Sequence, residues 1–109
     1  MVYEISTYWA AEGKLENLHN RFRTLTLGLF KRLGLQVVGF WTPTPATAET
    51  GDLVYILAFP DEAAKIAAWE TFRADPEWLA GKAKSEEHGV LVTKVVRVLT
   101  NPTDYSPLK

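Results

Sequence analysis

The chain has 109 residues, of which 47% are hydrophobic and 23% charged, a composition typical of a folded protein that forms one domain, residues 1–109. Its formal net charge of −1 excludes the basic surface with which proteins bind nucleic acids or anionic membranes. It has no cysteine, which excludes a disulfide framework and a thiolate metal site. The longest apolar run, Leu53 to Phe59, is too short to span a membrane. The sequence does not begin with a basic region followed by an apolar stretch, as a secretory signal does, so we expect a cytoplasmic protein.

Strands and helices are expected to alternate along the chain. Segment 2–9 is β-branched and aromatic and predicts a strand, whereas from residue 14 the apolar residues recur at steps of three and four and predict a helix that ends before Gly34. Segments 35–42 and 52–59 predict two strands joined by a loop rich in proline and small polar residues. Asp61 begins a second helix that runs to about residue 74, and Asp75 begins a third that runs to about His88. Segment 90–100 predicts the last strand.

This order of elements, β-α-β-β-α-β with one added short helix, is the split βαβ pattern of the α+β ferredoxin-like fold. Right-handed connections place both main helices on one face of a four-stranded antiparallel sheet. Segments 53–59 and 90–99 are apolar on both of their sides, and helices on one face cover only one of them. We therefore expect a second copy of the chain to cover the other face, in a homodimer.

Aromatic residues suggest a pocket for a small apolar or aromatic molecule between the helices and the sheet. Four tryptophans are many for this length, and an indole offers a flat apolar wall to a ring-shaped ligand. Core packing is the commoner explanation of such residues. Arg97 interrupts an apolar strand, so it either points to solvent at a sheet edge or supplies the charge of that pocket. The candidate pocket residues are Tyr3, Trp41, Tyr55, Trp69, Trp78 and Arg97.

The sequence offers one weak candidate for a catalytic group. His19 borders the apolar stripe of the first helix and is placed for a proton shuttle, although a half-exposed histidine at the rim of the core is more common. His88 lies where a helix end favours a cation. Neither histidine has a carboxylate at ligand spacing, so we expect no metal site. Phosphate-loop, dinucleotide and serine-hydrolase motifs are all missing.

Four short motifs together resemble the NIPSNAP family. They are Val2-Tyr3-Glu4-Ile5-Ser6-Thr7-Tyr8, Gly39-Phe40-Trp41, Asp75-Pro76-Glu77-Trp78 and Tyr105-Ser106-Pro107-Leu108. The similarity covers nearly the whole chain. It implies a dimeric α/β barrel, in a superfamily that also holds cofactor-independent quinol monooxygenases, haem-degrading enzymes and muconolactone isomerases. It does not imply one reaction.

The chain departs from the pattern of these relatives in three places. Ser6 stands where NIPSNAP members usually carry an arginine, and segment 56–59 is less aromatic than the corresponding strand of the family. Haem-degrading relatives use an asparagine on the first strand, a tryptophan on the second helix and a histidine beyond it. Trp69 matches the tryptophan, but segment 80–83 lacks the histidine and the first strand offers only Ser6 or Thr7. Haem degradation is therefore not expected, and we expect no cofactor.

Three functional hypotheses follow. The leading one is a NIPSNAP-like dimeric protein that binds a small apolar or aromatic molecule, its biochemical activity unassigned. The first alternative is a cofactor-independent monooxygenase acting on a phenolic or quinol-like substrate, with His19 as its base. The second alternative is a non-enzymatic adaptor that works through its surface.

Overall fold

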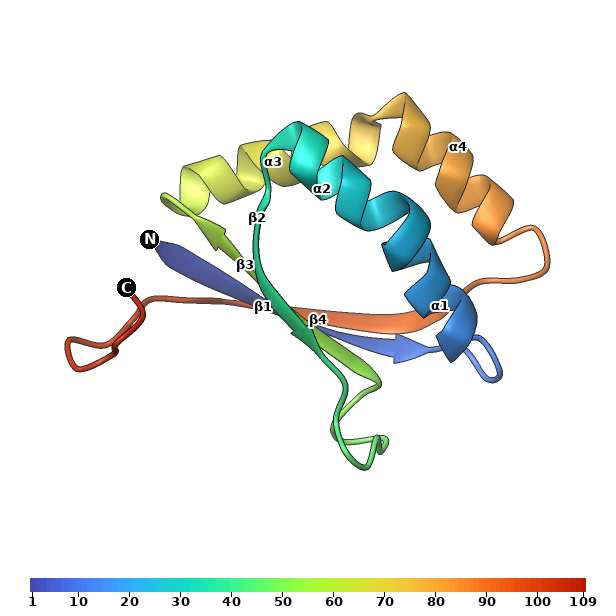
Figure 1. Ribbon diagram of the computed structural model, residues 1–109, viewed down its shortest axis with the longest axis horizontal. Helices are drawn as coiled ribbons and strands as arrows, with labels where there is room; N and C mark the ends of the chain where they lie inside the picture. Colours follow the sequence, from blue (N-terminus) through green and yellow to red (C-terminus); the bar gives the residue numbers. More distant parts are fainter.

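The computed structural model describes residues 1–109 as a four-stranded antiparallel sheet with helices on one face (Figure 1). The strands are β1 (Val2–Ala10), β2 (Gln36–Trp41), β3 (Leu53–Phe59) and β4 (Val92–Thr100), and they lie in the order β2-β3-β1-β4. The helical segments are α1 (Leu15–Arg21), the π-helical turn η1 (Phe22–Thr26), α2 (Leu27–Leu33), α3 (Glu62–Ala74) and α4 (Pro76–Ser85). The predicted α+β ferredoxin-like fold is confirmed. None of the helices combines the length and the apolar composition that a membrane-spanning helix needs.

The capping residues start and stop the helices where the sequence predicted. Gly34 ends α2 with φ 78°, a left-handed conformation that favours glycine. The Asp61 carboxylate accepts a hydrogen bond from the Ala64 amide at 2.8 Å and so begins α3. Asp75 accepts hydrogen bonds from two amides of the first turn of α4, which has proline at its first position.

Three features of the helices and strands differ from the prediction by more than one residue. The first helix is not a continuous α-helix, because η1 widens it between α1 and α2. Helix α4 ends at Ser85 rather than near His88, and β4 begins at Val92 rather than at residue 90. The chain turns between them at Gly89, whose φ is 120°.

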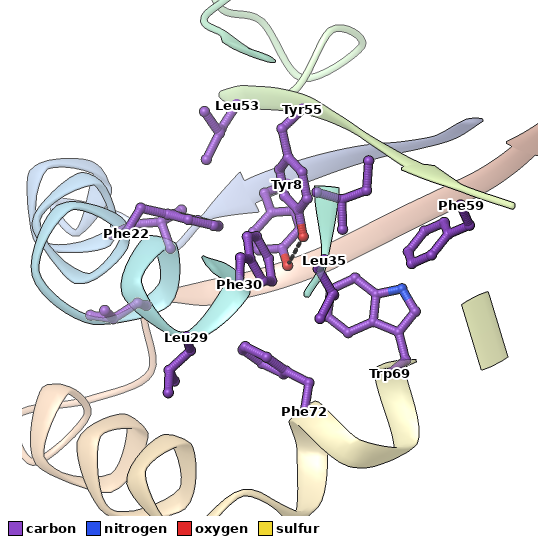
Figure 2. Close-up of a cluster of buried hydrophobic side chains, with 13 residues drawn as sticks. Tyr8, Phe22, Leu29, Phe30, Leu35, Leu53, Tyr55, Phe59, Trp69 and Phe72 are labelled. Atoms are coloured by element: carbon purple, nitrogen blue, oxygen red, sulfur yellow. Dashed lines mark hydrogen bonds between the residues drawn. The ribbon is translucent and has the colours of Figure 1, made fainter. Parts of the chain in front are cut away.

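Side chains alternate in direction along β1, and this alternation determines which residues of the strand the helices cover. Glu4, Ser6 and Tyr8 are buried and face the helices, while the intervening odd-numbered residues face the other side of the sheet. On the helix side, 13 residues form the hydrophobic core, including Tyr8, Tyr55 and Trp69 (Figure 2).

The opposite face of the sheet carries no helix (Figure 1). Its β4 residues Val96 and Val98 are 39% and 51% exposed, and they lie beside Thr7 and Ile5 of β1. Trp41 of β2 is also 51% exposed and lies beside Val54 of β3 on this face. We refer to the side of the sheet that bears these residues as the open face.

Candidate functional site

A cavity of about 580 Å³ lies between β4 and the helices. This volume is in the range of small-molecule binding sites. Ten of its 18 lining residues are hydrophobic, so most of the wall suits an apolar body. The buried part of the lining consists of five aromatic residues, Tyr8, Phe22, Phe30, Trp69 and Phe72, together with Arg21 and Thr26. Exposed residues of α4, of β4 and of the segment between them lie at the rim, namely Leu79, Lys82, Val90, Thr93, Lys94 and Val95.

Arg97 of β4 binds a group of buried hydroxyls. Its Nη1 donates hydrogen bonds to Ser6 Oγ at 2.6 Å and to Tyr55 Oη at 3.0 Å. Its Nη2 donates to Tyr8 Oη at 3.0 Å. The two tyrosine hydroxyls lie 2.9 Å apart and share a hydrogen bond (Figure 2). Ser6 and Arg97 are direct cross-strand neighbours, so strand register alone brings the guanidinium to this position.

The charge of Arg97 has no counterion in the protein. None of the ion pairs in the structure involves Arg97, although the residue is partly buried. Its guanidinium carbon instead lies 4.3 Å from the ring centroid of Trp69 and 5.5 Å from that of Tyr8, which are distances of cation–π contacts. Neutral hydroxyls and aromatic faces are therefore its whole environment.

The buried tyrosine of this cluster is held neutral. Burial raises the pKa of Tyr55 well above its ordinary value, and the neighbouring Tyr8 raises it further, while the Arg97 guanidinium opposes the shift. For Arg97, burial alone would lower the pKa, but the two tyrosines raise it above the ordinary arginine value. The cluster thus presents the fixed positive charge of Arg97 beside a buried Tyr55 hydroxyl that keeps its proton at neutral pH.

Trp69 is fixed on the cavity wall by a buried carboxylate. Its Nε1 donates a hydrogen bond to Glu4 Oε1 at 2.7 Å, and the other carboxylate oxygen lies 3.8 Å from Lys65 Nζ. Glu4 is only 2% exposed, and a buried carboxylate requires such partners. The bond sets the orientation of the indole against which Arg97 packs.

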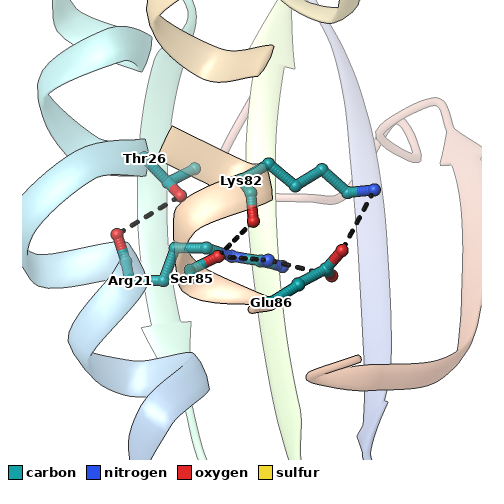
Figure 3. A network of polar contacts seen from close by, with 5 residues as sticks. All are labelled: Arg21, Thr26, Lys82, Ser85 and Glu86. Carbon is teal, nitrogen blue, oxygen red and sulfur yellow. Dashed lines mark hydrogen bonds and ion pairs between the residues drawn. The ribbon is translucent and has the colours of Figure 1, made fainter. Parts of the chain in front are cut away.

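Arg21 joins the first helix to α4 at one side of the cavity (Figure 3). Its Nη1 donates to Ser85 Oγ and to Glu86 Oε2, both at 3.2 Å, and its guanidinium lies over the Trp78 ring. Lys82 forms a second ion pair with Glu86 at 3.6 Å. Arg21 Nε is buried and has no hydrogen-bond partner.

The π-helical turn η1 belongs to the cavity. Phe22 and Thr26, its first and last residues, both line the wall, and Arg21 precedes it. A π-helical turn adds one residue to a turn of the helix and so changes the direction of the neighbouring side chains. Such turns are frequent at functional sites. The Thr26 hydroxyl bonds weakly to the Arg21 carbonyl at 3.5 Å (Figure 3).

The structure brings together some of the predicted site residues and separates others. Trp69, Trp78 and Arg97 line the cavity, and Tyr55 lies behind Arg97 as its hydrogen-bond partner. Tyr3 and Trp41 lie outside it, on the open face, because their positions in β1 and β2 have the opposite parity. His19 is half-buried on α1 and does not line the cavity.

The side chain of Arg97 does not point to solvent at a sheet edge, which is the commoner interpretation of an arginine in an apolar strand. Strand β4 is an edge strand, as an aggregation-blocking arginine would require. The side chain nevertheless points over the sheet to β1 and β3 rather than to solvent. Nor is it the only charge of the cavity, since Arg21, Arg73, Lys82, Lys94 and Glu86 also line it.

Apart from exposed polar residues of the rim, sequence analysis missed three buried residues of the wall that carry a polar group, Tyr8, Arg21 and Thr26. A signal for Arg21 exists, because it lies three residues after Leu18 and four before Leu25 and so falls on the buried stripe of the helix. Tyr8 shares its face of β1 with Glu4 and Ser6, and polar residues of this kind normally indicate a solvent-facing side.

The family model NIPSNAP matches residues 3–107. The chain belongs to the NIPSNAP family. A comparison with the curated proteins found no match. The family assignment of this NIPSNAP protein therefore does not identify an activity.

Solved structures of NIPSNAP proteins are similar to this one over their whole length. An uncharacterized NIPSNAP domain protein from Burkholderia xenovorans is 23% identical, with a TM-score of 0.81 and coverage of 98% of this chain and 99% of that chain. A NIPSNAP family protein from Agrobacterium tumefaciens is 16% identical, with a TM-score of 0.83 and coverage of 99% and 98%. An antibiotic biosynthesis monooxygenase structure is 14% identical, with a TM-score of 0.63 and coverage of 94% and 99%. At these identities the likeness is one of fold.

Proposed function

We propose that this NIPSNAP protein binds a small aromatic or largely apolar molecule in the cavity between β4 and the helices. The observation that carries the proposal is the composition of the wall, where buried aromatic rings meet one fixed guanidinium. Trp69 and Phe72 project from α3 toward the sheet (Figure 2), and their rings are 5.4 Å apart in an edge-to-face arrangement. Such rigid aromatic walls bind planar ligands with little loss of side-chain entropy.

Residues of β1, β4 and the helices line the cavity. Its specificity comes from few polar groups, as in most small-molecule sites, and these are Arg21, Arg97 and the hydroxyls of Tyr8 and Thr26.

Two adjacent residues of β4 provide a matched test. Val95 and Val96 are 40% and 39% exposed, but Val95 lines the cavity and Val96 lies on the open face. Val95→Trp places a bulky ring in the cavity mouth, whereas Val96→Trp adds the same bulk elsewhere. Titration calorimetry with the neutral probe 2-naphthamide measures the effect.

Wild-type protein and Val96→Trp should bind the probe alike, and Val95→Trp should lose roughly tenfold or more in affinity, because an overfilled site must displace packed side chains to admit a ligand. Equal affinities for the two variants would contradict the proposed site. Circular dichroism of both variants establishes that each is folded.

We propose further that the open face is the interface of a homodimer. Two valines of β4 and Trp41 are exposed there, and Lys94, opposite Trp9, is the one charged residue among the β1 and β4 residues paired on that side. Its Nζ lies 4.7 Å from the centroid of the Trp9 ring. A face with so little charge meets a second copy of itself without repulsion, and a two-fold axis closes the assembly.

A cofactor-independent monooxygenase acting on a phenol or quinol is the second candidate. Arg97 favours it, because a guanidinium at the cavity wall stabilises a phenolate, the form that gives an electron to dioxygen most readily. The predicted base, His19, lies outside the cavity, so the phenolic proton would pass to water. Oxygen consumption in the presence of a naphthoquinol tests this activity. The wild-type protein should consume oxygen faster than the Val95→Trp variant.

A further inference from the structure

Positive charge dominates the cavity. Five of its lining residues are cationic and one, Glu86, is a carboxylate. That carboxylate is already engaged by Arg21 and Lys82. Lys94 directs its Nζ to the Trp9 ring on the open face, so Arg73 and Arg97 are the cations of the lining that face the cavity without an acid bound to them. The chain as a whole has a formal net charge of −1, so this local excess is not a property of the general composition.

The most buried of these free cations has donors to spare. A guanidinium has five N–H groups, and Arg97 uses three of them on Ser6, Tyr55 and Tyr8. Its Nε and one Nη2 hydrogen remain without a partner. Arg21 Nε is the one fully buried side-chain nitrogen or oxygen that lacks a partner, so the unpartnered Nε of Arg97 is not fully buried and can be reached from the cavity that Arg97 lines.

We propose that the natural ligand is an anion, a small aromatic or apolar carboxylic acid whose carboxylate pairs with Arg97 and whose ring or chain packs on Trp69 and Phe72. This inference rests on the proposed function and specifies its ligand class. A planar guanidinium pairs with a carboxylate through parallel hydrogen bonds, and it does so most strongly where protein excludes water. The aromatic wall requires an organic body, so an inorganic anion does not satisfy the site.

The rim adds a second electrostatic element. Arg73 and Lys82 are exposed around the mouth, and Arg73 lies against the same Trp69 indole at 5.5 Å from its ring centroid. Exposed cations attract an anionic ligand over distances up to about one Debye length. Their contribution to the affinity becomes small when salt screens them. The affinity for an acid should therefore fall with ionic strength, while that for a neutral analogue should not.

The test compares sodium 2-naphthoate with 2-naphthamide, which have the same ring and differ in charge. Titration calorimetry at neutral pH is carried out on the wild-type protein, on Arg97→Met and on the surface control Arg23→Met. Arg23 is exposed, pairs only with Glu16 and does not line the cavity. Arg97→Lys is included because it keeps the charge and loses the planar fork.

We expect the wild-type protein and Arg23→Met to bind the acid roughly tenfold or more tightly than the amide, the preference typical of a charge-assisted pair. In Arg97→Met the two affinities should become equal through loss of acid binding, and Arg97→Lys should lie between. A wild-type protein that binds both probes equally would overturn the anion inference and leave the cavity proposal standing. Binding of neither probe would overturn both. The wild-type comparison decides the matter even where a variant fails to fold.

Discussion

Trp69 and Glu4 are joined by a 2.7 Å hydrogen bond between two buried side chains, which links α3 to the central strand β1. The two residues are 65 positions apart in the sequence. The bond places the Trp69 indole between the hydrophobic core and Arg97, so the packing of a helix and the orientation of the cavity wall depend on the same contact.

This contact predicts an energetic coupling between the two positions. Trp69→Phe removes the indole donor and leaves a buried carboxylate oxygen without its partner, so the free energy of unfolding should fall by about 1–3 kcal/mol. Part of that loss should disappear in a Glu4→Gln background, giving a coupling of roughly 0.5 kcal/mol or more in a double-mutant cycle. Urea unfolding at fixed protein concentration measures all four proteins. Strictly additive losses would contradict the linkage.

Tyr55 predicts a loss of stability in alkali. Burial raises its pKa in the folded protein, whereas in the unfolded chain it ionises near pH 10. The folded state then binds more protons than the unfolded state above that pH, so the stabilising contribution is complete below about pH 10 and is lost as the pH rises further, by about 1.4 kcal/mol per unit.

Denaturant unfolding between pH 8 and 11 compares the wild-type protein with Tyr55→Phe, which cannot ionise. The alkaline slope of the variant should be smaller by the contribution of one proton. Identical slopes for the two proteins would mean that Tyr55 ionises equally in both states, against its position in the core.

The proposed dimer predicts opposite outcomes for two exposed apolar residues. Val98 is 51% exposed on the open face, and Ile66 is 48% exposed on α3. Val98→Lys places a charge in the interface and should give a folded monomer, because an unpaired charge is costly to bury. Ile66→Lys should leave the dimer intact. Analytical ultracentrifugation of both variants measures the mass, and an unchanged assembly in Val98→Lys would refute this interface.

Two glycines with a left-handed backbone conformation distinguish the cost of that conformation from the cost of steric crowding. Gly51 has φ 75°, and a Cβ there would lie 2.6 Å from Thr7 Cγ2, whereas Gly34 has φ 78° and open space around it. Gly34→Ala should cost about 1 kcal/mol through conformation alone. Gly51→Ala should cost about 1–3 kcal/mol more, since the added methyl group meets packed atoms. Thermal unfolding that shows equal losses would contradict this packing at Gly51.

The fold could be predicted from the sequence because its signals are local. Asp61, Asp75 and Gly34 cap helices in the structure as their positions indicated. The π-helical turn could not be predicted, since the apolar steps from Leu15 to Leu33 fit a regular helix. A single inserted position changes which side chains face the sheet without changing that pattern visibly.

The candidate site was predictable only in part. Trp69, Trp78 and Arg97 were named, but the side of β1 that faces the helices could not be inferred, because it carries Glu4, Ser6 and Tyr8. A polar side of a strand normally faces solvent. Here it faces the helices, because Trp69 and Arg97 supply hydrogen bonds to Glu4 and to Ser6 and Tyr8. These partners come from distant segments and leave no mark on the local sequence.

The position of Ser6 illustrates the same point. The resemblance to the NIPSNAP pattern predicts an arginine at this place in β1, where this chain has Ser6. The cross-strand neighbour Arg97 nevertheless brings a guanidinium within 2.6 Å of the Ser6 hydroxyl. A departure in one strand is thus accompanied by a charge from the next strand, which only the register of the sheet reveals.

A crystal structure of the protein grown with 2-naphthoate tests the central claim most directly. The account predicts the naphthalene ring against Trp69 and Phe72 in the cavity, with a carboxylate oxygen at about 3 Å from the Arg97 guanidinium. A naphthoate held by the rim cations Arg73 and Lys82 alone, or seated on the open face beside Trp41, would contradict it.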